Sequence, residues 1–255
     1  GDAELDEGNV WETVAEEAIR GLGNVIWIVD LNRQSLDRVI PGVRADRLKA
    51  LFAGAGWKVF EAKYGTLLES AMAGPGGSAL RRRIDEMSNE EYQALIRLKD
   101  GAELRSRISA VADAKYRGDI LRSLKATSDD ELRDLIANLG GHDLPKLIEV
   151  LNQADAVEDA PAVVFAYTVK GWGLPMAGDP LNHSLLLTQT QMEALLPTLG
   201  DGIEDVWAGL PEDSPAWQLA RRAADRLAET HETDTLFDPA NLPVTLDARH
   251  PQTTS

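Results

Sequence analysis

Two short polar segments carry oxygen-rich residues at a spacing that could form a cation site. The first is Gly1-Asp2-Ala3-Glu4, and the second runs from Asp30 to Gln34, so that Asp2 and Asn32 are thirty residues apart. A carboxylate, an amide oxygen and a backbone carbonyl are hard donors of the kind that Mg²⁺ prefers, together with phosphate oxygens and water. These residue types therefore suggest a site for Mg²⁺ and a phosphate-bearing ligand.

The elements around these segments predict an α/β fold with a doubly wound, mostly parallel sheet. Short β-branched and aromatic runs at 25–29, 57–60 and 162–167 are typical of buried parallel strands. Apolar residues at helical spacing indicate helices over 9–22 and 44–53. Ligands of such sheets bind at the carboxyl ends of the strands, which is where Asn32 falls.

The chain divides into segments of different composition. We expect residues 1–76 to form the first part of an α/β domain, 77–152 a helical insertion, and 153–230 the return to the sheet with further helices. Ser128 and Glu131 have the spacing of a capping box inside the insertion. Helices are predicted over 188–196 and 214–228, and residues 231–255 are interpreted as a linker toward a further domain.

Composition excludes several functional classes. The formal net charge of −16 disfavours binding to nucleic acid or to an anionic membrane surface. The chain has no cysteine, which rules out disulfides and thiolate chemistry and is compatible with a cytoplasmic protein. Its apolar runs are all shorter than the roughly 20 residues that span a bilayer.

Several blocks in order resemble one family of thiamine-diphosphate enzymes. They are GDAELDEGN, DLNRQSLD, GAGWKVFEAKYG, GGHDLPKL and AYTVKGWG, spread over roughly residues 1–200. A Gly-Asp-Gly sequence followed about thirty residues later by Asn is the metal–diphosphate signature of these enzymes. The blocks are similar to the homodimeric bacterial type of pyruvate dehydrogenase decarboxylating component, in its incomplete diphosphate-binding domain.

The resemblance implies a role for each matching position. Asp2 and Asn32 would give side-chain oxygens to Mg²⁺, and Gln34 its backbone carbonyl. Ala3 and Glu4 would lie beside the diphosphate of thiamine diphosphate, and Leu36 near the central ring of that cofactor. Lys170 matches a lysine near the reacting centre, and His183 matches a mobile-loop histidine that helps to pass the acetyl group on.

The resemblance also implies partners and a wider context. The substrate would be pyruvate or a related 2-oxoacid, the acceptor a lipoyl-bearing acyltransferase of a multienzyme complex, and the parent protein a homodimer. The glutamate that activates the cofactor would lie beyond Ser255, so the chain is expected to be an inactive fragment by itself. Ala3 departs from the family pattern, since it stands where a second glycine is usual, and the loop from Lys170 to His183 is shorter.

Structural explanations compete with these assignments. Asp2 and Glu4 could be a solvated acidic terminus, and Asn32 could be a turn residue. His142 invites a catalytic role, but Gly140-Gly141-His142-Asp143 also describes an ordinary turn between helices with Asp143 as the N-cap. The basic run 81–83 is interpreted as a solvated helix face.

Two other functions remain open at this point. A transketolase-like ketol transferase would use the same cofactor, although no cluster of Arg and His that could anchor sugar phosphates is evident. A non-catalytic α/β scaffold domain is the third hypothesis, and Ala3 at the diphosphate position favours it.

Overall fold

The computed structural model describes residues 1–32, 34–35, 38–39, 45–199 and 209–229, and the side chains of residues 33–44 lie outside this description. Two compact units are present, Gly1–Leu195 and Leu196–Ser255. The first unit contains the sheet and all of the candidate site residues.

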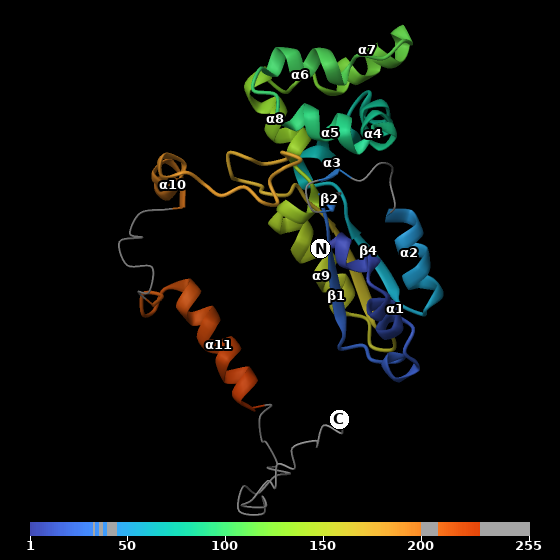
Figure 1. Ribbon diagram of the computed structural model, residues 1–255, viewed down its shortest axis with the longest axis vertical. Helices are drawn as coiled ribbons and strands as arrows, with labels where there is room; N and C mark the ends of the chain where they lie inside the picture. Colours follow the sequence, from blue (N-terminus) through green and yellow to red (C-terminus); the bar gives the residue numbers. More distant parts are fainter. Residues whose placement is uncertain (33, 36–37, 40–44, 200–208, 230–255) are drawn as a thin grey trace, which may run out of the picture. The chain divides into compact units, whose positions relative to one another are not determined.

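A three-stranded parallel sheet organises the first unit (Figure 1). Its strands are β1 (Ile26–Leu31), β4 (Lys58–Ala62) and β5 (Ala162–Tyr167), in the order β1-β5-β4. All six residues of β5 are buried, because this continuously apolar strand lies between the other two and is covered on both faces. The predicted α/β class and the parallel strands are confirmed, with small shifts at the ends of β1 and β4.

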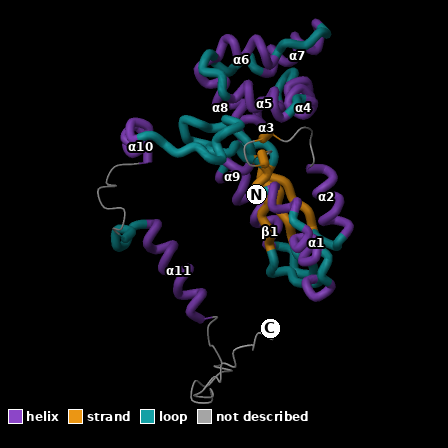
Figure 2. Tube along the Cα trace, viewed as in Figure 1, coloured by secondary structure: helices purple, strands orange, loops and turns teal. Residues whose placement is uncertain are grey.

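Helices cover both faces of this sheet (Figure 2). On one face, α9 (Leu144–Asp155) packs Val150 and Ala154 against Ala162 and Val164. The other face belongs to the main core, which also receives α2 (Ala45–Gly54) and the N-terminal helices. Alternate residues of β5 face the two layers, as the strand geometry requires.

An aromatic cluster forms the centre of the main core. Phe52 on α2 is fully buried, and its ring lies 5.5–6.0 Å from the rings of four other aromatic residues, which are Trp11, Trp27, Trp57 and Phe165. Most of these pairs meet edge to face, the geometry that the aromatic quadrupole favours. The cluster joins residues that are distant in the sequence, so it fixes the N-terminal segment against the sheet.

The predicted single helix over residues 9–22 is wrong. The chain instead forms the 3₁₀ helix η1 (Asp2–Asp6), then α1 (Gly8–Val14), then the 3₁₀ helix η2 (Glu17–Ile19). The indole N–H of Trp57 donates to the carbonyl oxygen of Val14 at 3.0 Å. A long-range partner therefore takes this carbonyl at the end of α1, which local periodicity could not reveal.

A short hairpin follows β1 and was not predicted. Its strands are β2 (Gln34–Ser35) and β3 (Arg38–Val39), paired antiparallel. This hairpin contacts η1, so the two segments with candidate metal ligands lie against each other.

Most of the remaining helices follow β4 in the sequence. They are α3 (Thr66–Ala73), α4 (Gly77–Glu86), α5 (Asn89–Ile96), α6 (Gly101–Ile108), α7 (Ala114–Ser123), α8 (Asp129–Ala137) and the 3₁₀ turn η3 (Gly140–His142). The capping box of Ser128 and Glu131 is confirmed. Arg83 is not part of a solvated face, since its side chain is 11% exposed and donates to the carbonyl of Ile108.

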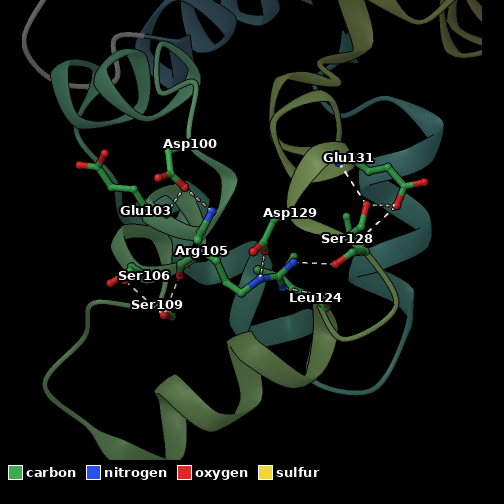
Figure 3. Close-up of polar contacts among 11 residues, drawn as sticks. Asp100, Glu103, Arg105, Ser106, Ser109, Leu124, Ser128, Asp129 and Glu131 are labelled. Atoms are coloured by element: carbon green, nitrogen blue, oxygen red, sulfur yellow. Dashed lines mark hydrogen bonds and ion pairs between the residues drawn. The ribbon is translucent and has the colours of Figure 1, made fainter.

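Arg105 on α6 holds the turn between α7 and α8 in place (Figure 3). Its guanidinium donates to the carboxylate of Asp129 and to the carbonyl oxygens of Leu124 and Thr127, at 2.6, 3.1 and 2.6 Å. The planar fork of arginine can reach these three acceptors at once. This helical region is therefore cross-linked by polar contacts as well as by its apolar core.

The later helices occur where the sequence predicted them. α10 (Gln189–Leu195) closes the first unit, and the second contains the 3₁₀ helix η4 (Leu196–Leu199) and α11 (Pro215–Glu229). Within the described ranges, no helix combines the length and the apolar character that crossing a membrane requires.

Candidate functional site

Polar residues gather at the carboxyl ends of the three strands. Asn32 follows β1, Lys63 follows β4, and the segment Thr168-Val169-Lys170 follows β5. The turn η3 lies at the same edge, since Gly140 donates its N–H to the carbonyl of Lys63 at 3.1 Å. The fold therefore brings four segments of the sequence to one edge of the sheet, the usual ligand-binding edge of such folds.

Asp2 and Asn32 meet at this edge, as their spacing predicts. Asp2 is 9% exposed, and the backbone of Asn32 lies close enough to its carboxylate to act on its pKa. One carboxylate oxygen of Asp2, Oδ1, is buried and has no hydrogen-bond partner in the described structure. Burial, together with the negative charge of Asp30, raises the pKa of Asp2 to about 6. A buried carboxylate in this state would be stabilised by a nearby cation.

Asp30 holds the Asn32 side chain from the last part of β1. Asn32 Nδ2 donates to Asp30 Oδ2 at 3.3 Å, and the hydroxyl of Thr168 donates to Asp30 Oδ1. Because Nδ2 is directed at an acceptor, the amide oxygen Oδ1 of Asn32 lies in the same plane on the opposite side of Cγ, facing away from Asp30. Sequence reasoning did not assign Asp30 a role, although its two-residue spacing from Asn32 along a strand was a usable signal.

The donor set fits a hard divalent cation. Asp2 offers a carboxylate oxygen without a partner, and Asn32 offers an amide whose orientation is fixed. Gln34 lies in β2, in the hairpin that contacts η1. No group of three His, Cys, Asp or Glu side chains that could hold a metal occurs among the residues that the structure describes. The predicted set does not require one, since it uses a single carboxylate with amide and backbone oxygens.

The other residues predicted to contact the cofactor differ in burial and in their neighbours. Ala3 is half-buried within η1. Glu4 is exposed and pairs with the amino group of Gly1 at 2.6 Å, which lowers its pKa, and the positive charge of Lys170 also acts on it. Leu36 lies outside the described residues.

Lys170 and His183 lie together, thirteen residues apart in the sequence. Lys170 Nζ is 2.9 Å from His183 Nδ1. The carbonyl oxygen of Lys170 accepts from the side-chain amide of Asn182 at 2.8 Å and from the backbone N–H of Gly178 at 3.0 Å. Gly171 has a φ of +72°, which favours glycine at the start of this tight loop. The loop therefore closes on itself and brings the two predicted catalytic residues together.

His142 combines the turn that was predicted with contacts that were not. Asp143 is the N-cap of α9, as expected, and accepts from the backbone of Lys146 at 3.0 Å. In addition, His142 Nε2 accepts from the backbone N–H of Val169 at 2.7 Å. The imidazole also stacks on Trp172, with ring centroids 4.6 Å apart. No local pattern pointed to these contacts, because their partners lie 27 and 30 residues away.

A large surface groove is lined by other residues. It has a volume of about 830 Å³ and is lined by α3, the end of α7 and the start of α8, with Leu67, Ala71 and Leu135 among its residues. None of the predicted site residues lines it. By contrast, the space beside Asn32, Thr168 and Val169 is a small depression. Among the residues that the structure describes, the candidate site therefore forms a polar surface at the sheet edge beside this small depression.

The fold and these residues define an α/β protein with a parallel sheet and a polar cluster at the carboxyl ends of its strands. No family model matches the chain. Individual curated relatives do match it, and all of those that we compared carry the same name, pyruvate dehydrogenase E1 component. The protein from Buchnera aphidicola is 32% identical over 184 residues, which is 71% of this chain and 20% of the relative.

Two further relatives give the same result. The protein from Pseudomonas aeruginosa is 31% identical over 68% of this chain and 19% of its own length. The one from Cupriavidus necator is 28% identical over 89% of this chain and 26% of its own length. The resemblance predicted from the sequence blocks is thus confirmed: the chain is related to a segment of the pyruvate dehydrogenase E1 component. It spans about a fifth to a quarter of the length of these relatives.

Proposed function

We propose that this chain is the part of a thiamine-diphosphate-dependent pyruvate dehydrogenase that holds Mg²⁺ and the cofactor's diphosphate. The observation that carries the proposal is the unpartnered, buried carboxylate oxygen of Asp2, held beside Asn32 at the carboxyl end of β1. A cation there would neutralise the paired charges of Asp2 and Asp30 and allow an acidic protein to accept a diphosphate.

Each residue has a defined part in this proposal. Asp2, Asn32 and the backbone carbonyl of Gln34 would hold Mg²⁺, and Ala3 and Glu4 would lie along the diphosphate. Leu36 would pack near the central ring of the cofactor. Bound thiamine diphosphate would supply a nucleophilic carbon and an electron sink for decarboxylation of a 2-oxoacid, while the protein supplies binding and orientation.

Lys170 and His183 would serve the reacting end of the site. Their side chains form one hydrogen-bonded pair, in which a protonated lysine donates to the imidazole. In the assembled site, such a pair would present a lysine and an imidazole to the substrate carboxylate and the acetyl acceptor. We assign Lys170 to electrostatic stabilisation of the substrate and His183 to proton transfer during acetyl transfer.

The partners follow from the same proposal. Pyruvate or a related 2-oxoacid is the substrate, a lipoyl-bearing acyltransferase receives the acetyl group, and the working protein is a cytoplasmic homodimer. The names of the relatives support pyruvate dehydrogenase chemistry over ketol transfer between sugar phosphates. Ala3 is the residue that speaks for a scaffold role, but the buried, unpartnered Oδ1 of Asp2 favours a cation site, and no observation on the described residues favours a transketolase.

Calorimetry with thiamine diphosphate and Mg²⁺ tests the proposal on the protein that carries this sequence. We expect binding that requires both components, and Asn32→Ala should weaken it by at least roughly tenfold, the effect expected when a metal ligand or its support is lost. Asn152→Ala is the matched control, because Asn152 is exposed on α9 away from the site. Absence of binding by the folded protein, or equal losses in the two variants, would refute the assignment.

A further inference from the structure

His142 is placed to control the backbone segment that carries Lys170. The segment Val169–Trp172 leaves the end of β5, and His142 contacts it at both ends. Its Nε2 accepts from the N–H of Val169 at 2.7 Å, and its ring stacks on Trp172 at a centroid separation of 4.6 Å and an interplanar angle of 12°. Lys170 lies between these two contacts in the sequence.

The turn that carries His142 is rigidly fixed to the sheet. A Cβ atom on Gly140 would lie 2.4 Å from the backbone of Ala62, and one on Gly141 would lie 2.6 Å from the carbonyl oxygen of Tyr167. Only glycine can approach the ends of β4 and β5 so closely. This close packing fixes the position of His142 at the carboxyl end of β5.

Asp143 anchors the same turn from the other side. Its carboxylate is 7% exposed and accepts from the backbone N–H groups of Lys146 and Thr66, at 3.0 and 2.9 Å. It also accepts from the Thr66 hydroxyl at 2.7 Å and from the Asn138 amide at 3.3 Å. These contacts join the starts of α9 and α3. The residue next to His142 is therefore anchored to two helices.

We infer that His142 is a positioning residue that fixes the Val169–Trp172 segment, and with it Lys170, at the carboxyl end of β5. A backbone N–H can only donate, so the hydrogen bond from Val169 requires an unprotonated Nε2 and a neutral ring with its proton on Nδ1. The functional importance of this inference rests on the role proposed for Lys170, but the positioning itself can be measured without any ligand.

The charge state of His142 should decide whether the segment is held. Protonation would place an N–H on Nε2 facing the N–H of Val169, and the hydrogen bond would be lost. Burial lowers the pKa of His142, and the charge of Asp30 on β1 opposes this effect. Asp143, the acidic neighbour in the sequence, is engaged with Thr66 and Lys146. We therefore expect His142 to be neutral and bonded to Val169 at neutral pH. In acid, the Val169–Trp172 segment should be released.

Residue-resolved amide hydrogen exchange on the ligand-free chain is the primary test. His142→Phe keeps an aromatic ring against Trp172 but removes the acceptor, and it should speed exchange of the Val169 amide by roughly tenfold. The amide of Thr168, which donates to the carbonyl of Leu31 at 3.2 Å, is the internal control and should not change. His142→Gln, whose side-chain oxygen can accept, should restore part of the protection.

A second readout follows Lys170 itself. In His142→Phe, the rate of acetylation of Lys170 by an amine-reactive reagent should rise, while that of exposed Lys115 on α7 should not. A purely structural role for His142 would leave the reactivity of Lys170 unchanged. Unchanged protection of Val169, or an unchanged Lys170 rate, would overturn the inference.

The pH profile of the unmodified chain covers the case in which His142→Phe does not fold. The ratio of Val169 to Thr168 protection should fall as pH decreases, with a midpoint equal to the pKa of His142 measured by NMR. A ratio that stays constant through that titration would overturn the inference. Because none of the three measurements uses cofactor, their outcome is independent of whether thiamine diphosphate binds.

Discussion

The carboxylate of Asp2 lies against the backbone of Asn32, which acts on its pKa, although α1, the 3₁₀ helix η2 and β1 separate the two residues in the sequence. The contact closes the N-terminal segment onto the carboxyl end of β1. It leaves Asp2 Oδ1 buried and without a partner in the described structure, next to a second carboxylate, that of Asp30. The arrangement is electrostatically unfavourable without a cation, and this makes it informative about function.

Removing the charge of Asp2 should stabilise the ligand-free chain. Folding raises the pKa of Asp2 from 3.8 to about 6, so the folded state binds this proton more tightly than the unfolded state. The resulting stability is fully present below about pH 4 and is lost as pH rises through about 6. Asp2→Asn should avoid this loss, which is at most on the order of 3 kcal/mol.

Urea denaturation at pH 4.5 and pH 8 measures this difference. The free energy of unfolding of Asp2→Asn should exceed that of the unmodified chain at pH 8, and the difference should be clearly smaller at the lower pH. Glu12→Gln, at an exposed position of α1, removes the same charge and serves as the control. A constant difference between Asp2→Asn and the unmodified chain at both pH values would contradict the raised pKa.

Ala3→Gly should improve binding of the diphosphate. If the backbone of η1 approaches the phosphate oxygens, the methyl group of Ala3 limits that approach and glycine removes the limit. We expect affinity for thiamine diphosphate with Mg²⁺ to rise several-fold by calorimetry, despite a cost of about 1 kcal/mol for glycine within a helical segment. Ala15→Gly, exposed at the end of α1, controls for that cost. Weaker binding by Ala3→Gly would show that the methyl group is not what limits the site.

Phe52 should contribute more to stability than its neighbour on the same helix. Phe52 is fully buried among four aromatic rings, whereas the adjacent Leu51 is 47% exposed. Phe52→Ala should reduce the free energy of unfolding by about 3–5 kcal/mol, because it leaves a cavity at the centre of the core. Leu51→Ala should reduce the free energy of unfolding far less in the same urea titration. Equal reductions for the two variants would show that Phe52 is not central to the core.

Asp143→Ala should destabilise the sheet edge in a pH-dependent way. Burial by itself would raise the pKa of Asp143, but its hydrogen bonds from Lys146, Thr66 and Asn138 outweigh this effect and lower it. A lowered carboxyl pKa gives stability that is present above the unfolded value of 3.8 and is lost as pH falls through the folded value.

The loss in Asp143→Ala should therefore be large at pH 7 and should shrink below pH 4. Losing a helix N-cap costs about 1 kcal/mol, and the buried donors left without a partner add to it. Asp134→Ala, at an exposed position of α8, is the control and should have little effect on thermal unfolding at either pH. A loss for Asp143→Ala that is independent of pH would argue against an ionised cap.

The sequence predicted correctly those features that depend on residues close together in the chain. The continuously apolar run 162–167 predicted a buried strand, and it forms β5 with all six residues buried. Ser128 and Glu131 predicted a capping box, and Asp143 predicted an N-cap, because these hydrogen bonds join residues only three positions apart. The sequence blocks likewise predicted the relationship to a segment of the pyruvate dehydrogenase E1 component.

Contacts between distant segments were beyond the reach of local patterns. Periodicity predicted one helix over 9–22, but α1 ends at Val14. The carbonyl oxygen of Val14 accepts a hydrogen bond from the distant Trp57 indole. The short hairpin of β2 and β3 and the packing of Arg83 against Ile108 depend in the same way on neighbours that the sequence does not name.

The sequence by itself determined which residue types are available at this sheet edge and which elements carry them. Tertiary structure decided which of them meet: it inserted β5 between β1 and β4, placed Thr168 against Asp30, and brought His142 Nε2 to the N–H of Val169. The reason is physical. Helix and strand preferences act over a few residues, whereas the order of strands and the pairing of polar side chains follow from burying the apolar faces of the whole unit.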